Sequence, residues 1–181
     1  MIYLFLAPGF EEVEALFPLD LLRRASLDVR TVGIGGRTVT GSHGITVTAD
    51  MTDSDYLSLK DDAPHMIILP GGMPGTLNLD ASPAVAYAID TAVASDAYLC
   101  AICAAPLILG RRGLLKGRRA TCYPGFEAEL TGATEIGGRV IRDGKIITAT
   151  GMGVAMEFGL ELISVLAGPE TAGRIKESIR A

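Results

Sequence analysis

Histidine and cysteine are scarce in this chain of 181 residues, which contains two histidines and three cysteines. A structural zinc site usually takes about four such ligands at short spacings, and no second cysteine pair accompanies Cys100 and Cys103. An odd number of cysteines without framework spacing also argues against a disulfide-stapled secreted domain. We therefore expect no metal site and a reducing, cytoplasmic compartment.

Long apolar runs and an excess of positive charge are also missing. No apolar segment is long enough to span a bilayer. Residues 1–9 are apolar but few, lack a basic leader and run into acidic residues, so we expect a first strand and not a signal peptide. The formal net charge of −5 argues against nucleic acid as a partner. Linkers, repeats and low-complexity stretches are absent as well, which predicts a single domain over residues 1–181.

Apolar residues make up 49% of the chain and are accompanied by 22 glycines, a mix typical of buried strands joined by tight turns. Strands alternate with helices, which predicts a mostly parallel sheet with helices on both faces. The apolar pattern places strands at residues 3–7, 29–34, 65–69, 98–102 and 148–150, short β segments at 38–40, 45–49 and 119–123, and a β-hairpin at 140–147. It places helices at residues 11–26, where Pro18 predicts a kink or a break, and at 154–167 and 170–180. Residues 78–95 are expected to form one or two helices, and residues 53–60 a loop or short helix.

The central motif is YLCAICAAP at residues 98–106. An apolar run ends at Cys103, and small residues follow before Pro106, which suits a first helical turn. The pattern predicts a buried strand, a sharp turn with Cys103 at its tip and a helix just after, as in the nucleophile elbows of hydrolases. A thiol held there faces the free N–H groups and positive end of a helix, and both favour the reactive thiolate.

Other interpretations of these cysteines remain open. Free cysteines commonly act as small buried hydrophobes, and Cys100 fits that description because it lies inside the predicted strand. Cys100 and Cys103 also form a Cys-x-x-Cys redox or metal pattern. A redox pair would open the helix, however, whereas here the first cysteine falls within the strand, so we rank that interpretation below the others.

A second turn, PGGMPG at residues 70–75, follows another buried strand. Its glycines either let the backbone approach a ligand with N–H groups pointing inward, or form a plain tight turn. The strand ends near residues 8–9, 71–72, 103 and 123–124 would meet at the carboxyl edge of a parallel sheet, where such folds place their sites. We expect the backbone N–H groups of Gly72 and Ala104 to stabilise an oxyanion there.

A cysteine nucleophile also needs a group that accepts and donates protons. Three glutamates lie in the first strand-to-helix connection: Glu11, Glu12 and Glu14. We expect two of them in a solvated first turn and one beside Cys103. Because a second negative charge would raise the cysteine pKa, either that acid is held neutral or the cysteine is not activated. His43, in a β-rich loop, is a further candidate, whereas His65 begins a strand at the opposite end.

Three blocks of the chain resemble the ThiJ/PfpI superfamily, in the branch of the parkinsonism-associated protein called DJ-one. They are APGFEEVEA at residues 7–15, LPGG at 69–72 and AICAAP at 101–106. Together these blocks are specific, and the resemblance covers essentially the whole chain in order. It implies a flavodoxin-like three-layer sandwich, usually assembled as a homodimer.

The resemblance also implies site residues. Cys103 would be the elbow cysteine and Glu14 the acid that touches it, with Gly71, Gly72 and Ala104 around the sulfur. Arg24 matches a family arginine near the dimer interface and the site.

One position departs from the family pattern. Many members carry a histidine in the strand after the elbow, where this chain has Tyr123. A Cys-His-acid triad is therefore not expected, which weakens the peptidase activity associated with parts of the superfamily. Tyr123 would either hydrogen-bond a substrate or pack, and the adjacent Cys122 would be a packed thiol or a second redox-active one.

By this resemblance, the protein would convert methylglyoxal or glyoxal to a hydroxy acid without glutathione, a metal or any other cofactor. Cys103 would form a hemithioacetal and Glu14 would shuttle protons, and repair of glycated groups (a deglycase activity) is a related possibility. The alternative is a cysteine-based sensor of oxidative stress, because a thiolate is also the form that peroxide oxidises. A cysteine amidase or peptidase comes third, since the histidine is missing.

Overall fold

The computed structural model describes residues 1–59 and 63–181 around a seven-stranded sheet in the order β10-β11-β7-β6-β1-β2-β5. The strands are β1 (Ile2–Leu6), β2 (Val29–Gly33), β5 (Met51–Thr52), β6 (Met66–Leu69), β7 (Tyr98–Ile102), β10 (Val140–Asp143) and β11 (Ile146–Ala149). All neighbours are parallel except β10 and β11, which form the predicted hairpin. The chain therefore winds outwards from β1 in both directions, and the carboxyl ends of the parallel strands share one edge.

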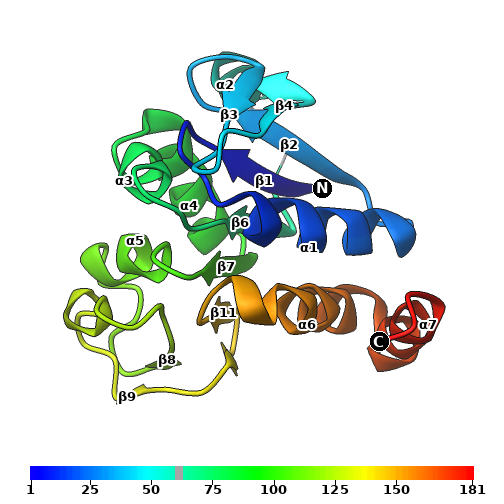
Figure 1. Ribbon diagram of the computed structural model, residues 1–181. Helices are drawn as coiled ribbons and strands as arrows, with labels where there is room; N and C mark the ends of the chain where they lie inside the picture. The colour runs from blue at the N-terminus through cyan, green and yellow to red at the C-terminus, as the bar shows by residue number, and fades with distance from the viewer. Residues whose placement is uncertain (60–62) are drawn as a thin grey trace.

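Helices cover both faces of this sheet (Figure 1). One face carries α1 (Glu12–Arg24), α6 (Ala155–Ala167) and α7 (Pro169–Ser178). The other carries α2 (Asp53–Ser58), α3 (Gly75–Asp80), α4 (Pro83–Ala94) and α5 (Pro106–Arg111). Side chains of β1 alternate between the layers, Tyr3 and Phe5 on the α4 side and Leu4 and Leu6 on the α1 side. The predicted flavodoxin-like three-layer sandwich is confirmed.

Pro18 does not break the first helix, contrary to one of the two expected outcomes. Helix α1 runs from Glu12 to Arg24 with Pro18 inside it, buried where α1 packs on α6. A Cβ built on Gly159 of α6 would lie 3.1 Å from the Cα of Pro18, so glycine is what allows the helices this close. Packing between the helices holds α1 through the position where proline removes a backbone hydrogen bond.

Several predicted segments differ in extent. The region 78–95 contains two helices, which is one of the two expected arrangements, although α3 begins earlier than predicted, at Gly75. The last residue of the predicted segment 53–60 lies outside the described residues. The predicted strand 119–123 contains only β8 (Arg119–Ala120), which pairs with β9 (Glu135–Ile136) outside the main sheet. Residues 121–123 turn back to the main sheet instead, because Thr121 N–H donates to Thr148 Oγ1 at 2.9 Å.

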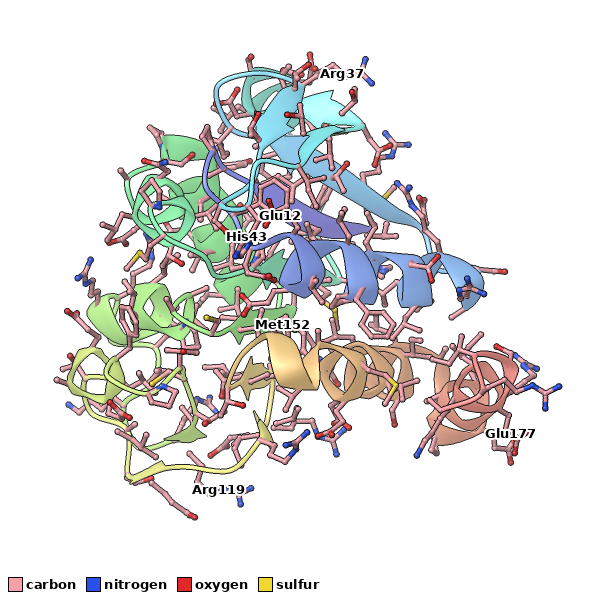
Figure 2. The ribbon with its side chains drawn as sticks, in the orientation of Figure 1. Glu12, Arg37, His43, Arg119, Met152 and Glu177 are labelled. Carbon is pink, nitrogen blue, oxygen red and sulfur yellow. The ribbon has the colours of Figure 1, made fainter. Side chains whose placement is uncertain are left out.

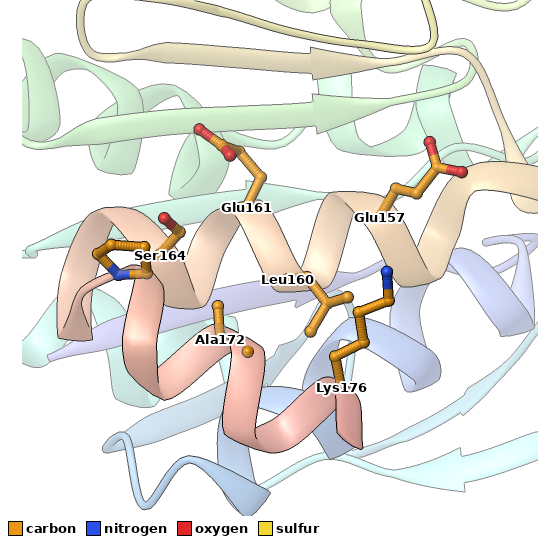
Figure 3. Close-up of a pocket in the computed structure, with 8 residues that line it drawn as sticks. Glu157, Leu160, Glu161, Ser164, Ala172 and Lys176 are labelled. Atoms are coloured by element: carbon orange, nitrogen blue, oxygen red, sulfur yellow. The ribbon is translucent and has the colours of Figure 1, made fainter. Parts of the chain in front are cut away.

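The remaining elements are short. Strands β3 (Thr38–Thr40) and β4 (Thr46–Thr48) form a second hairpin, and 3₁₀ turns occur at η1 (Glu127–Glu129) and η2 (Met152–Val154). A groove between α6 and α7, lined by Leu160, Ala172 and Lys176 among others, lies on the side of α6 that faces away from the sheet (Figure 3). Within the described residues, no helix has the length and apolar character needed to cross a membrane.

Candidate active site

Cys103 lies at the tip of a sharp turn between β7 and α5, as the sequence predicts. Its φ of +64° is in the left-handed region, which a residue with a side chain seldom adopts. Two backbone hydrogen bonds hold the turn, from Cys103 N–H to the Ala149 carbonyl at 2.9 Å and from Tyr123 N–H to the Cys103 carbonyl at 2.8 Å. Strain at one residue, supported from two other segments, is a common feature of functional sites.

Glu14 meets Cys103 from the first turn of α1. Its side chain is hydrogen-bonded to the Cys103 thiol, and the residue is only 1% exposed. Glu14 Oε2 accepts a hydrogen bond from Gly71 N–H at 3.0 Å, and the carboxyl group also accepts one from Met152 N–H. The acid is therefore fixed by backbone donors from two different loops and aimed at the sulfur.

Burial controls the electrostatics of this pair. It raises the pKa of Glu14 from 4.5 to about 7, the hydrogen bond with Cys103 acts against that rise, and the charge of Glu11 adds to it. Burial, then the charge of Glu14 and the hydrogen bond with it, raise the pKa of the Cys103 thiol to about 12. The N–H groups of Gly72 and Ala104 act in the opposite direction. Near neutral pH the pair thus gives up one proton, and that ionisation belongs to both groups together.

The expected lowering of the thiol pKa by the helix is wrong for the state in which Glu14 is ionised. The backbone donors at the elbow, Gly72 and Ala104, lower the pKa of the thiol, but they are the smallest of the influences on it. Desolvation and the adjacent carboxylate outweigh them. These shifts favour removal of the Cys103 proton by Glu14 over an independently acidic thiol.

The turn after β6 is a close backbone approach and not only a tight turn. A Cβ on Gly71 would lie 2.6 Å from Cys103 Cβ and 2.6 Å from Glu14 Oε2. Gly72 has a φ of +89°, and a Cβ there would collide with the backbone N of Glu11. Glycine at both positions lets the loop press against the sulfur, where the N–H of Gly72 is a donor.

Tyr123 lies beside this site, since its backbone N–H donates to the Cys103 carbonyl. Its side chain is half exposed, and its ring packs on Gly151, where a Cβ would come within 3.2 Å of Tyr123 Cδ2. The same Cβ would be 3.7 Å from Glu14 Oε1, so the phenol and the acid flank one short turn. Packing on Gly151 and contact with a bound molecule are compatible roles for this ring.

His43 lies next to Glu12 at the start of α1 (Figure 2), and no contact joins it to Cys103 among the described residues. His43 Nδ1 is 2.9 Å from Glu12 Oε2, and Glu12 Oε1 accepts the backbone N–H of His43 at 2.8 Å. Glu12 is 3% exposed, so the expectation of two solvated glutamates is wrong. The loop between β3 and β4 folds over its carboxylate and supplies donors to it.

One group of side chains in the described part of the chain has the spacing of a metal site: Glu11, Glu12 and His43, whose ligand atoms lie within 4.8 Å of one another. Both acids already accept hydrogen bonds from backbone N–H groups, Glu11 from Glu14 and Glu12 from His43. These hydrogen bonds explain why the three side chains lie together, because they hold the β3–β4 loop against the start of α1.

Arg24 does not join the site of this chain, contrary to its place among the expected pocket residues. It comes ten residues after Glu14 on α1, a separation of about 15 Å along a helix axis. Its guanidinium pairs with Asp20 at 2.6 Å on the exposed surface. Because Glu14 is the residue of α1 that contacts Cys103, the rise of the helix places Arg24 well away from the thiol.

The other cysteines are packed, and all three are free thiols. Cys100 is buried in the layer between the sheet and α1, and burial raises its pKa well above the ordinary value. Cys122 is 5% exposed, and burial raises its pKa to about 11. Neither thiol has the exposure or the lowered pKa of a redox-active group. His65 Nδ1 lies 3.2 Å from the amino group of Met1, at the opposite end of the strands as expected.

Two contributors escaped sequence reasoning. Met152 acts through its backbone N–H, which no side-chain pattern reveals, although the glycines on either side of it mark a turn after a strand. Glu11 accepts the backbone N–H of Glu14 at 2.7 Å as the N-cap of α1. Glutamate is not among the preferred N-cap residues, so residue type did not reveal this contact. The one available signal was that an N-cap side chain accepts the N–H three residues later, which here belongs to Glu14.

The family model described as DJ-1/PfpI matches residues 1–165 of this chain. Protein DJ-1 homolog B of Arabidopsis thaliana is 38% identical over 92% of this chain, which spans only 38% of that longer protein. The glutathione-independent glyoxalase DJR-1.2 of Caenorhabditis elegans is 32% identical over 88% of this chain and 84% of its own.

Solved structures agree with these matches. A DJ-1 superfamily protein from Salmonella typhimurium is 35% identical, with a TM-score of 0.92 over 99% of this chain and 97% of its own. Oxidized DJ-1 from Toxoplasma gondii is 34% identical, with a TM-score of 0.92 over 98% of this chain and 96% of its own. The chain belongs to the DJ-1/PfpI family.

Proposed function

We propose that this protein is a glutathione-independent glyoxalase that converts methylglyoxal or glyoxal to a hydroxy acid without a cofactor. The observation that carries the proposal is the hydrogen bond between Glu14 and the Cys103 thiol, beside the N–H donors of Gly72 and Ala104. A nucleophile, a proton carrier and oxyanion donors are the parts that addition to an aldehyde requires. The likeness to the nematode glyoxalase supports the same reaction.

In the first step, Cys103 Sγ bonds to the aldehyde carbon and the thiol proton passes to Glu14. Glu14 returns that proton to the aldehyde oxygen, which gives a neutral hemithioacetal and restores the carboxylate. The N–H groups of Gly72 and Ala104 are placed to stabilise the transient oxyanion. A carboxyl pKa near 7 suits an acid that must both take and return a proton at neutral pH.

In the second step, Glu14 moves a proton from the carbon bonded to sulfur to the ketone oxygen, which forms an enediol. The proton of the other hydroxyl then passes through Glu14 to the former ketone carbon, which leaves a thioester on Cys103. Water hydrolyses the thioester to lactate, or to glycolate from glyoxal, and restores the thiol. One substrate carbon is oxidised and its neighbour is reduced, so no external oxidant or reductant is needed.

The absence of a histidine beside the site sets this reaction apart from peptide hydrolysis. Tyr123 occupies the position beside the elbow, and a phenol does not act as a neutral-pH base in the way an imidazole does. Dicarbonyl addition needs only one group that shuttles protons, and Glu14 supplies it. The amidase or peptidase alternative therefore has less support than the glyoxalase.

The test is conversion of methylglyoxal to lactate without glutathione, followed across pH 5 to 9. Because the working state has lost one proton from the Glu14–Cys103 pair, we expect kcat/KM to rise with a midpoint near the Glu14 pKa of about 7. Lactate is measured with a coupled enzyme assay. Loss of methylglyoxal without lactate would contradict the proposal, because it would report only modification of nucleophilic side chains.

A sensor of oxidative stress is the second candidate function. In this case peroxide would oxidise the Cys103 thiolate to a sulfenic and then a sulfinic acid, with water as the reduced product. The likeness to the structure of oxidized DJ-1 from Toxoplasma gondii supports this candidate. We expect dilute hydrogen peroxide to add two oxygen atoms at Cys103 and none at the buried Cys100, as measured by peptide mass spectrometry. A Cys103 that stays unmodified would exclude this role.

Assembly and compartment also belong to the proposal. An apolar surface on α1 and the β3–β4 loop, formed by Val13, Leu16, Phe17 and Ile45, is available to a second copy of the chain. The family resemblance implies a homodimer, so we expect the molar mass in solution to be twice that of one chain. The three free thiols support the proposal of a reducing, cytoplasmic compartment.

A further inference from the structure

Glu11 lies behind Glu14 in a closed ring of hydrogen bonds. Glu11 Oε2 accepts the backbone N–H of Glu14 at 2.7 Å. Glu11 N–H donates to the Gly71 carbonyl at 2.9 Å, and Gly71 N–H donates to Glu14 Oε2 at 3.0 Å. One residue thus holds both the backbone that carries the acid and the loop that binds the acid's side chain.

The side chain of Glu11 also places a negative charge next to this acid. It is only 13% exposed, so water screens that charge less than at an open surface. Its charge raises the pKa of Glu14, in addition to the larger effect of burial. Among the described residues, the Cys103 thiol is hydrogen-bonded to Glu14, while Glu12 from α1 and His43 from the β3–β4 loop lie beside Glu11, with His43 Nδ1 4.0 Å from its carboxylate. Tyr123 lies on the other side of Gly151 from Glu14.

We propose that Glu11 is a positioning residue that fixes Glu14 as its helix cap and, through its charge, sets the pH at which the Glu14–Cys103 pair loses its first proton. The inference rests on the proposed function only for its consequence in turnover. A negative charge behind the acid keeps the proton on the pair to higher pH, which places the working range nearer neutrality. Glu12 does not share this role, because its carboxylate faces His43 and the loop.

The test is the rate of Cys103 alkylation by iodoacetamide from pH 5 to 9, which needs no enzymatic turnover. Glu11→Gln keeps a carbonyl oxygen for the Glu14 N–H but removes the charge. We expect its profile to move to lower pH, so that at pH 6 it reacts roughly two- to threefold faster than the wild type and the curves converge above pH 8. Glu11→Ser, a neutral residue and a preferred N-cap, should shift the profile in the same direction.

Glu12→Gln is the matched control, since it removes a neighbouring buried carboxylate that does not face Glu14. Its profile should coincide with that of the wild type. The inference is wrong if both Glu11 variants coincide with the wild type, or if Glu12→Gln shifts the profile as far as they do. Alkylation that shifts as expected in a protein without lactate formation would overturn the glyoxalase proposal and leave the role of Glu11 standing.

Discussion

Replacing Cys103 with serine should reduce lactate formation from methylglyoxal at least about a thousandfold. A hydroxyl group has a far higher pKa than a thiol and is a much weaker nucleophile, and Glu14, with a pKa of about 7, is too weak a base to activate it. The side chains are close in size, so the elbow, held by backbone hydrogen bonds from Cys103 to Ala149 and from Tyr123, should keep its shape. The measurement is kcat/KM in the coupled lactate assay.

Cys122→Ser is the matched control for that variant. Cys122 is next to Tyr123 but is packed in the layer on the α4 side of the sheet. We expect it to keep turnover within about twofold while losing some stability, because a more polar hydroxyl replaces a packed thiol that is 5% exposed. If Cys103→Ser formed lactate at the wild-type rate, Cys103 would not be the nucleophile.

Replacing Glu14 with glutamine should abolish most turnover and at the same time stabilise the protein at alkaline pH. Glutamine cannot take a proton from the Cys103 thiol, and loss of a general acid–base group costs typically 10²–10⁴-fold. Stability changes because a buried carboxylate is expensive. The rise of the Glu14 pKa from 4.5 to about 7 corresponds to about 3 kcal/mol of unfolding free energy.

The direction of this stability effect depends on pH. The folded state binds the Glu14 proton more tightly than the unfolded state does, so the favourable contribution is full below pH 4.5 and is lost as pH rises through about 7. Glutamine stays neutral throughout. Glu14→Gln should therefore match the wild type near pH 4 and exceed it by up to about 3 kcal/mol at pH 8, which corresponds to roughly 6 to 12 °C in Tm.

Denaturant unfolding of both proteins at pH 4 and pH 8 measures this difference directly. The quantity to compare is the difference in unfolding free energy between Glu14→Gln and the wild type, taken at each pH. The contributions of titrating groups that both proteins share cancel in this difference. A pH-independent effect of the substitution would mean that Glu14 is not the group that burial neutralises. If Glu14→Gln gained stability at pH 8 and kept full turnover, Glu14 would not be the group that carries protons in catalysis.

Local sequence was sufficient to predict the elbow. An apolar run, two alanines and Pro106 dictate a buried strand, a turn and a helix start within nine residues, and the structure has each of them. Asp143-Gly144 similarly predicted the β10–β11 hairpin, since the tight turn depends only on adjacent residues. The alternation of strands and helices predicted the parallel sheet, because short connections leave few other ways to bury both of its faces.

The environment of the acids could not be predicted in this way. Glu12 is buried because a loop some thirty residues later folds over it, and Met152 reaches Glu14 from more than a hundred residues away. Pro18 is tolerated in α1 because α6 packs against it through Gly159. Each of these contacts joins segments that no local pattern connects.

Local patterns were enough to predict the elbow, the glycine turn and the first helix, since each depends on neighbours along the chain. The proton chemistry depends instead on tertiary packing. Burial and adjacent charge set the pKa values of Glu14 and Cys103, and both depend on which surfaces pack together in three dimensions. For that reason the expected acidic thiol became a thiol that depends on Glu14 for its activation.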